Sequence, residues 1–450
     1  DKWTMTAQKI TVIFGRALLI TGLALAIAAC GGDKKKKGTP LKGERLSVLA
    51  LDRALEADPN LSNVKISLPK PYVNANWKQA GGGRTNAMHH LAIGERLQRV
   101  WKERIGQGSK DYEKLTAVPV VADGIIYTMD VRGQVRAFST DNGTERWRTR
   151  IRKKGERSKI GYGGGLALGG NAVFATTGYG ILAALDLATG SELWRYDAGV
   201  PLRGAPTYAD GRVFIVTHDN QMMALNSNDG SFIWDFIAIA EDATVLGASS
   251  PAVEGSTLIA AFSSGEIMAL RTENGQLAWQ DALTRTGSLT ALATLNDIVG
   301  HPVVDRGRVY AVSHSGRIIA VDLTSGERVW ENNIGSISTP WLAGSYIFLV
   351  TTDGEVVAIS ALSGRVHWVT PLQRFKKPKK RKGLIRWTGP VLAGDRLFVV
   401  SSHGYMLTLS PYTGEILSGI ELPDGTVISP IVANETLYVL TDHGDLLAFR

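Results

Sequence analysis

Few side chains in this sequence are spaced for chemistry. Its 450 residues contain one cysteine, and the eight histidines do not form a metal-ligand pattern. Three of them, His314, His403 and His443, lie one or two positions before a turn glycine, so turn chemistry accounts for them. A metal site built from a ring of such turns is the alternative, but we expect no metal and no cofactor. The sequence contains neither Gly-x-Ser-x-Gly nor a Walker-type loop, and we expect no catalytic residues.

The N-terminal segment is typical of a secretory signal. Lys9 and Arg16 are followed by a 13-residue apolar run, Ala17–Ala29. A run of this length is too short to cross a bilayer comfortably, and positive residues ahead of it are typical of a signal peptide. We therefore expect a signal peptide over residues 1–29, with Met5 as the true start.

The cysteine lies at the cleavage position of that signal. Residues 25–30 read LAIAAC and resemble the bacterial lipobox, whose cysteine is lipidated and becomes the mature N-terminus. A free cysteine after an ordinary signal peptide is the alternative. Gly31 stands where an aspartate would favour inner-membrane retention. We expect Cys30 to anchor the protein to the outer membrane, on its periplasmic face.

The basic residues are concentrated in two short segments. Lys34–Lys37 contributes four positive charges and residues 376–382 contribute six, which together exceed the formal net charge of +8. A nucleic-acid-binding protein would carry its cations along a face or groove, so we expect no nucleic-acid partner. Residues 30–95, which are poor in strand patterning, predict a flexible tether and N-terminal extension. The segment 375–383 is a solvated loop, a contact for an acidic partner, or a contact for anionic headgroups.

One pattern of strands and turns repeats through the chain. In residues 302–330, PVVDRGRVYAVSHSGRIIAVDLTSGERVW, apolar residues alternate on either side of Gly316, and Trp330 follows Gly326 by four positions. Runs of β-branched residues between Gly turns predict strands joined by hairpins. The Gly-x-x-x-Trp mark occurs six times, and a seventh copy, Gly414 to Ser418, loses the tryptophan. The seven glycines are 38 to 51 residues apart, in the range of propeller blades.

An eighth copy of the repeat is divided between the two ends of the chain. The strand Asp445–Phe449 has no Gly-Trp mark after it, and Leu97–Ile105 carries a tryptophan with no repeat before it. We therefore predict an all-β fold over residues 96–450: an eight-bladed β-propeller of four-stranded blades, closed by an N-terminal strand that completes the last blade. An open β-solenoid or two β-sandwiches are the alternatives.

The tryptophans of the repeats are expected to be structural. Each opens the outermost strand of a blade, where an aromatic side chain can bury a large area between neighbouring blades. Because Ser418 replaces the tryptophan in one blade, we expect that blade to dock less tightly. The expected structural residues are Trp101, Trp147, Trp194, Trp234, Trp279, Trp330 and Trp368.

The Gly-x-x-x-Trp mark resembles the repeat of pyrroloquinoline-quinone-type propellers. Two periplasmic families use it: the quinoprotein dehydrogenases and the BamB family, lipoproteins of the outer-membrane β-barrel assembly machinery. Residues 96–450 are similar to the BamB family, with local matches at 101–108, 295–304 and 433–449. The dehydrogenase resemblance implies carboxylate and amide ligands for Ca²⁺ and an adjacent-cysteine disulfide, whereas this chain has a single cysteine.

The BamB resemblance implies a partner surface on two neighbouring loops. In that family these loops hold the periplasmic POTRA domains of the barrel subunit BamA. The pattern Leu-x-Leu-Arg-Gly falls on residues 243–247, where Val245 keeps the apolar character and Leu246 stands in place of the arginine. The pattern Leu-x-Asp-x-Asp begins at Leu295, keeps Asp297 and has Val299 in place of the second acid. A more apolar contact is therefore expected, and ordinary loops are the alternative.

The sequence favours a non-enzymatic scaffold that assists assembly and insertion of outer-membrane β-barrel proteins. The resemblance implies BamA-type barrel proteins, other lipoproteins of the machinery and unfolded outer-membrane proteins as partners, and attachment to the membrane through the N-terminal lipid. A quinoprotein dehydrogenase is the alternative. A propeller that binds cell-wall or signalling partners is a third possibility.

Overall fold

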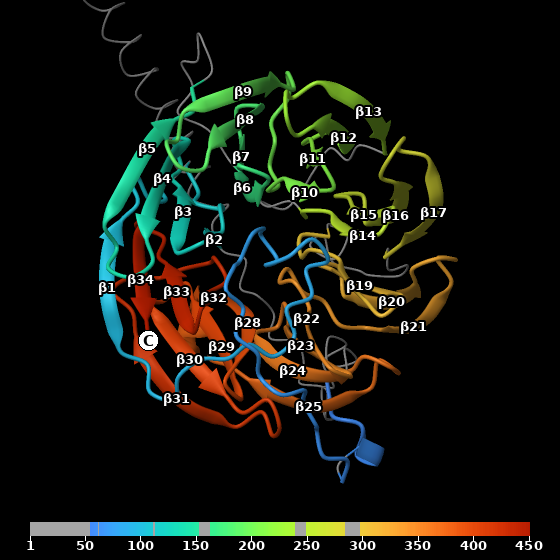
Figure 1. Ribbon diagram of the computed structural model, residues 1–450. Helices are drawn as coiled ribbons and strands as arrows, with labels where there is room; N and C mark the ends of the chain where they lie inside the picture. The colour runs from blue at the N-terminus through green and yellow to red at the C-terminus, as the bar shows by residue number, and fades with distance from the viewer. Residues whose placement is uncertain (1–54, 62, 111–112, 153–162, 239–248, 284–297) are drawn as a thin grey trace, which may run out of the picture. The chain divides into compact units, whose positions relative to one another are not determined.

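In the computed structural model, eight four-stranded antiparallel sheets surround a common axis (Figure 1). The structure describes residues 55–61, 63–110, 113–152, 163–238, 249–283 and 298–450. In each sheet the strands follow one another outwards, so that a short strand lies near the axis and the fourth strand lies at the rim. The predicted eight-bladed β-propeller is confirmed.

The blades are numbered here in chain order. Blade 1 comprises β2 (Val120–Ala122), β3 (Ile125–Met129), β4 (Gln134–Ser139) and β5 (Glu145–Arg150). Blade 2 comprises β6 (Gly164–Gly169), β7 (Ala172–Thr177), β8 (Ile181–Asp186) and β9 (Glu192–Asp197). Blade 3 comprises β10 (Thr207–Ala209), β11 (Arg212–Val216), β12 (Gln221–Asn226) and β13 (Phe232–Ile237). Blade 4 comprises β14 (Ala252–Glu254), β15 (Thr257–Ala261), β16 (Glu266–Arg271) and β17 (Leu277–Ala282).

The second half of the ring has the same plan. Blade 5 comprises β18 (Val303–Asp305), β19 (Arg308–Ser313), β20 (Arg317–Asp322) and β21 (Arg328–Asn332). Blade 6 comprises β22 (Trp341–Ala343), β23 (Tyr346–Val350), β24 (Glu355–Ser360) and β25 (Val366–Pro371). Blade 7 comprises β28 (Trp387–Ala393), β29 (Arg396–Ser401), β30 (Tyr405–Leu409) and β31 (Ile416–Glu421). Blade 8 comprises β32 (Ile431–Ala433), β33 (Thr436–Leu440), β34 (Asp445–Phe449) and β1 (Arg99–Arg104).

The burial of each strand follows from its place in the blade. The middle strands pack between two neighbouring blades and are buried on both faces, as in β7, where all six residues are buried. Rim strands such as β5 alternate between exposed and buried positions, because only one face packs on a neighbour. This explains why the middle strands are continuous apolar runs and the rim strands are not.

Adjacent blades are joined by a repeated contact between a tryptophan and a glycine. Trp147 of β5 packs against Gly190 in the next blade, where an added Cβ would lie 2.4 Å from its ring. The indole N–H also donates to the carbonyl of Leu187 in that blade, at 2.9 Å. The same donation to the next blade is made by Trp101, Trp194, Trp234, Trp279, Trp330 and Trp368, over 2.8 to 3.1 Å. All seven are thus part of the architecture.

The exception occurs where the ring closes. Ser418 of β31 is exposed and shares a hydrogen bond with Thr408 of its own blade at 2.7 Å. Its neighbour, blade 8, has no glycine turn between its last two strands, because β34 and β1 are not consecutive in the chain. The two amides of Gln98 and Arg450 instead exchange backbone hydrogen bonds at 2.7 and 3.0 Å. The interface between blades 7 and 8 therefore lacks both the tryptophan and the turn glycine that a tryptophan contacts at the other interfaces.

The N-terminal extension makes one circuit of the innermost strands. Between Asn74 and Leu91 it hydrogen-bonds to each blade in ring order, beginning with blade 8 and ending with blade 7. Its successive partners on the innermost strands are Val432, Val121, Leu168, Tyr208, Val253, Val304, Trp341 and Leu392. These strands have a free edge towards the axis, and the extension satisfies part of that edge in seven blades. In blade 6 the bond comes instead from the indole N–H of Trp341, which donates to the His89 carbonyl.

The expectation of a flexible tether over residues 30–95 is therefore wrong for residues 63–95. These residues carry no strand periodicity, but their backbone is held by the unpaired strand edges rather than by a sheet of their own. The body that contains the ring begins at Leu55. The short 3-10 helix Pro59–Leu61 precedes the circuit, and the N–H of Asp58 donates to Val366 of blade 6 at 2.9 Å.

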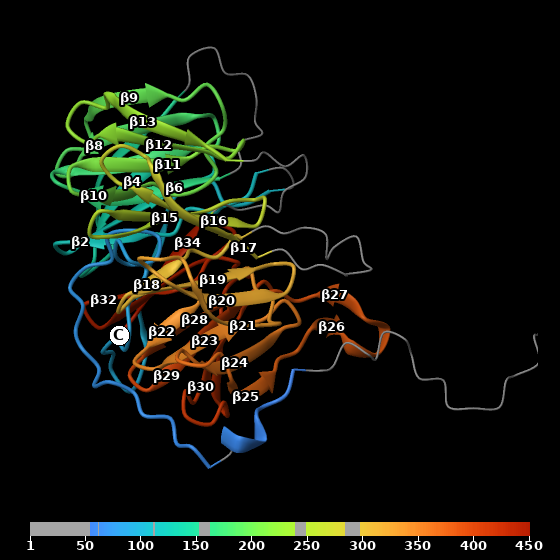
Figure 2. The same ribbon diagram turned by 90° about the vertical axis from the view of Figure 1, so that its right-hand side faces the viewer.

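The ring has two different faces, which are visible edge-on (Figure 2). The extension covers the face that carries the turns between first and second strands, which we call the extension face. The opposite face, the loop face, carries the described ends of the connections between blades and a separate hairpin formed by β26 (Phe375–Lys377), the 3-10 helix Pro378–Lys380 and β27 (Lys382–Leu384). Within the described residues, no helix has the length and apolarity needed to cross a bilayer.

Candidate functional site

The ring has a central cavity, and the extension contributes to its lining. It has a volume of about 260 Å³, and its walls come from the connections between blades on the loop face. Trp77, Ala80, Gly81 and Asn86 of the extension contribute to its lining, together with Trp341 of blade 6. The rings of Trp77 and Trp341 are stacked, with centroids 6.3 Å apart. The propeller therefore has a central pocket that is lined by the extension and by the connections between blades.

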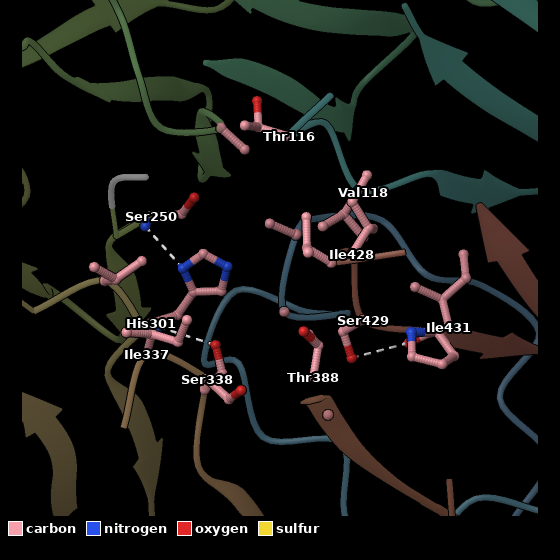
Figure 3. Close-up of a pocket in the computed structure, with 18 of the residues that line it drawn as sticks. Thr116, Val118, Ser250, His301, Ile337, Ser338, Thr388, Ile428, Ser429 and Ile431 are labelled. Atoms are coloured by element: carbon pink, nitrogen blue, oxygen red, sulfur yellow. Dashed lines mark hydrogen bonds between the residues drawn. The ribbon is translucent and has the colours of Figure 1, made fainter. Parts of the chain in front are cut away.

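His301 projects from the wall of this cavity (Figure 3). The backbone N–H of Ser250 donates to its Nδ1 at 2.9 Å, and the N–H of His301 itself donates to Thr339 Oγ1 at 3.0 Å. Burial lowers the pKa of His301 from 6.5 to about 4, so the ring is neutral at physiological pH. One residue thus joins three successive connections between blades.

The residues around His301 fix the end of its connection. Ile298 is buried in the core between blades 4 and 5, and Val299 lines the cavity. Gly300 leaves no room for a side chain, because an added Cβ would lie 2.5 Å from the Ser338 carbonyl oxygen. The carbonyl of Pro302 accepts from the buried Asn86 side chain at 2.9 Å, which links this connection to the extension. Ile298, Gly300 and His301 of the segment LNDIVGHPVV therefore each have a structural role.

The described cavity lining has few ionisable side chains and no carboxylate. The ionisable side chains that line it are Arg203, Arg386 and His301, and no Asp, Glu or Cys is among the described lining residues. Across the described part of the chain, no three His, Cys, Asp or Glu side chains form a group that could hold a metal ion. A divalent cation prefers carboxylate oxygens, so this lining does not suit one.

The predicted partner-binding residues fall at the edge of what the structure describes. Val245, Leu246, Leu295 and Asp297 lie outside the described residues, as does the predicted lipid-bearing Cys30. Val299 is half-buried in the cavity wall. The described ends of the two connections, at Ser250 and His301, are directly bonded to each other.

The three histidines at hairpin turns do not converge in the described structure on a site. His443 is exposed and pairs with Asp424 at 3.1 Å, and His403 is exposed with its ring 5.8 Å from that of Tyr405. Burial lowers the pKa of the half-buried His314. They occupy the turns between second and third strands, as the turn interpretation predicts.

Sequence reasoning missed the role of His301 and of the extension. His301 lies within LNDIVGHPVV, but nothing in the sequence pairs it with Ser250, which is 51 positions away. Asn86 has a positive φ of 59°, a conformation that Asn tolerates better than most residues. The cluster Gly81, Gly82 and Gly83 before it was the available signal that the chain turns sharply at this point.

Comparison with known proteins identifies the family. A family model described as outer membrane protein assembly factor BamB matches residues 131–370, which is more than half of the chain. Assembly factors BamB of Moranella endobia and Yersinia pestis are 26% and 27% identical over 360 and 356 residues, covering 78% of this chain and 89% and 88% of the relatives.

Solved structures share the fold. BamB from Moraxella catarrhalis matches with a TM-score of 0.67 and 23% identity, over 79% of this chain and 100% of that one. A europium-containing methanol dehydrogenase matches with a TM-score of 0.68 and 13% identity, over 83% and 98%. The fold is therefore shared with dehydrogenases, whereas the family model and both sequence relatives carry the name of an assembly factor. The chain belongs to the BamB family of outer membrane protein assembly factors.

Proposed function

We propose that this protein is a non-enzymatic scaffold of the outer-membrane assembly machinery that binds the POTRA domains of a BamA-type barrel subunit. The observation that carries the proposal is the 2.9 Å hydrogen bond from Ser250 N–H to His301 Nδ1. It joins the ends of the connections 238–251 and 283–302, which contain the two partner loops expected from the family resemblance. Loops with adjacent fixed ends can act as one binding surface.

The composition of the expected loops favours an apolar contact. The first loop has two apolar residues, Val245 and Leu246. The second loop keeps Leu295 and one acid of the family pattern, Asp297, and has the apolar Val299 in place of the other acid. Contacts at the centre of protein interfaces are commonly apolar, with charged residues at the rim. Other lipoproteins of the machinery and unfolded outer-membrane proteins are further partners under this proposal.

The cavity supports a scaffold rather than a quinoprotein dehydrogenase. A dehydrogenase of the resembling family needs carboxylate ligands for Ca²⁺ beside its cofactor, and the described lining supplies none. The single cysteine also leaves no adjacent-cysteine disulfide. The likeness to methanol dehydrogenase is one of fold and does not favour the chemistry.

We propose that Cys30 carries the lipid that holds the protein at the periplasmic face of the outer membrane. The arrangement that supports this is a positive segment, a short apolar run and the chain's single cysteine at its end. Cys30→Ser should leave the precursor unprocessed or release the protein from the membrane fraction. An unchanged membrane fraction would contradict lipidation.

Site-specific crosslinking in native membranes tests the partner surface. A photo-crosslinking residue at position 245 or 297 should form an adduct with the POTRA-bearing barrel subunit. The matched control is Ser256, which is exposed in the turn between β14 and β15 on the extension face. Adducts from position 256 alone, or none from positions 245 and 297, would refute the proposed surface.

A further inference from the structure

The hairpin β26–β27 is an addition to the propeller plan. It lies in the connection between β25 and β28, and its two strands form a separate two-stranded sheet. Figure 2 shows it standing away from the blades, on the side opposite the extension. Its purpose is therefore not to complete a blade.

The hairpin carries an unusually concentrated positive charge. Its cations are all exposed, and none forms an ion pair with any described residue: Lys376, Lys377, Lys379, Lys380, Arg381 and Lys382. Lys377 lies directly opposite Lys382 in the strand register, an arrangement that is unfavourable for like charges. The sequence contains no Asp or Glu between Glu355 and Asp395, so the local repulsion is not relieved within the segment.

The base of the hairpin is firmly held. The N–H of Ile385 donates to the Arg374 carbonyl at 2.8 Å, and the indole N–H of Trp387 donates to the Gln373 carbonyl at 2.9 Å. Ile385 and Trp387 are buried in the core between blades 6 and 7. The charged end is therefore presented in a defined direction, on the loop face.

We infer that this hairpin binds anionic phospholipid headgroups. Five of its six cations are lysines, whose compact charges on flexible stems suit a diffuse layer of phosphates better than bidentate pairing with protein carboxylates. Leu384 is 57% exposed opposite Phe375 and adds an apolar contact beside the charges. Basic residues near an anionic surface each add to membrane attraction, and a lipid chain combined with a polybasic patch anchors more stably than either alone.

The inference rests on the proposed function only for the lipid anchor, which would hold the hairpin near a membrane. The test uses the full chain reconstituted in vesicles without any barrel protein, so its outcome is independent of the POTRA proposal. If Cys30 carries a lipid, as proposed above, its thiol is blocked. Pro378→Cys then supplies the one free thiol, to which an environment-sensitive dye is attached at the hairpin tip. Vesicles of phosphatidylcholine are compared with vesicles containing equal amounts of phosphatidylcholine and phosphatidylglycerol, each with a lipid-borne quencher.

We expect quenching to be on the order of tenfold stronger with phosphatidylglycerol. Raising the salt concentration to about 1 M should remove the difference, because the Debye length falls to about 3 Å. Replacing all six cations by glutamine should abolish it, and K377Q/K382Q, which also relieves the like-charge pair, should weaken it. The same dye on Ser256→Cys, on the opposite face, should show no dependence on lipid charge.

Equal quenching in both kinds of vesicle would overturn the inference. It would also be overturned if the dependence on phosphatidylglycerol survived the six substitutions, or if the dye responded to a soluble POTRA protein and to neither lipid. In the last case the hairpin is a protein contact. Failure to bind vesicles at all would likewise overturn the inference and would count against the lipid anchor, but it would leave the crosslinking test of the partner surface unaffected.

Discussion

The backbone N–H of Ser250 donates a 2.9 Å hydrogen bond to Nδ1 of His301, across the boundary between two connections on the loop face. A neutral imidazole that accepts at Nδ1 keeps its proton on Nε2, so the ring presents a donor to the cavity. The bond therefore depends on His301 remaining uncharged, because a protonated ring has no acceptor.

Acid should weaken the protein through His301. Its pKa is about 4 in the folded chain and ordinarily 6.5, so the unfolded chain binds more protons between these values. The stability that neutral His301 gives to the folded chain is fully present above pH 6.5 and is lost as the pH falls towards 4. At about 1.4 kcal/mol per pH unit, we expect a loss of up to about 3 kcal/mol in the free energy of unfolding.

Denaturant unfolding at several pH values measures this loss. His301→Asn keeps a possible acceptor and removes the titration, so its stability should fall less steeply than that of the native chain in this window. His403→Asn, at an exposed turn, is the control and should retain the native slope. Parallel curves for the native chain and His301→Asn would contradict the assignment.

Trp101 should be the most informative tryptophan, because it lies on the strand that closes the ring. It is 8% exposed, packs 5.8 Å from the ring of Tyr438 and donates to the Thr140 carbonyl at 3.0 Å. Trp101→Ala should lower the free energy of unfolding by roughly 3–5 kcal/mol. Val100→Ala, on the exposed side of the same strand, should change it by less than about 0.5 kcal/mol. If Trp101→Ala also changed the free energy of unfolding by less than about 0.5 kcal/mol, the closing strand would contribute little to stability.

Two glycine substitutions separate backbone strain from the tryptophan contact. Gly190 and Gly211 have φ values of 72° and 75°, so alanine at either position costs roughly 1–2 kcal/mol. An added Cβ at Gly190 would also lie 2.4 Å from the Trp147 ring, whereas Gly211 has nothing within 4 Å. Thermal unfolding should therefore show Gly190→Ala to be less stable than Gly211→Ala by a further 1–3 kcal/mol or so. Equal losses would show that the tryptophan ring yields without cost.

The circuit of the extension should open when its main anchor is removed. Trp77 is 3% exposed, and its backbone exchanges hydrogen bonds with Val121 at 2.7 and 2.8 Å. Trp77→Ala should raise hydrogen exchange on the order of a hundredfold at Val121 and over residues 74–91, because the opened state becomes easier to reach. Val73→Ala, at a site 52% exposed, should leave exchange unchanged. A rise spread equally over all blades would indicate loss of global stability instead.

The repeats allowed the ring to be predicted because each blade repeats the same local pattern. A glycine that must adopt a positive φ and a tryptophan four residues later are both visible in the sequence, so blade number and order follow from counting. The pairing of Trp147 with Gly190 was not predictable, since it joins two copies of the pattern rather than residues of one copy. The looser docking expected of the blade with Ser418 stays a prediction, and its neighbour, blade 8, has no glycine turn between β34 and β1.

The extension and the cavity could not be predicted because no periodicity encodes them. The backbone around Asn74 and Trp77 bonds to strand edges that belong to different blades, and such edges exist only once the ring has formed. The contact of His301 with Ser250 could not be predicted for the same reason, because folding of blade 4 is what brings these two residues together. Hairpin β26–β27 was expected as a loop, since its lysines have low strand propensity.

The pairing of β1 with β34 also bears on how the chain reaches its native state. Arg104 and Asp445, which face each other in this pair, are 341 positions apart, so the contact is among the slowest to form. Until it forms, β34 presents an unpaired edge whose matching strand is attached to the same molecule and to every other copy. At high concentration, refolding should therefore yield swapped dimers or longer chains of molecules, each donating β1 to the open blade of the next.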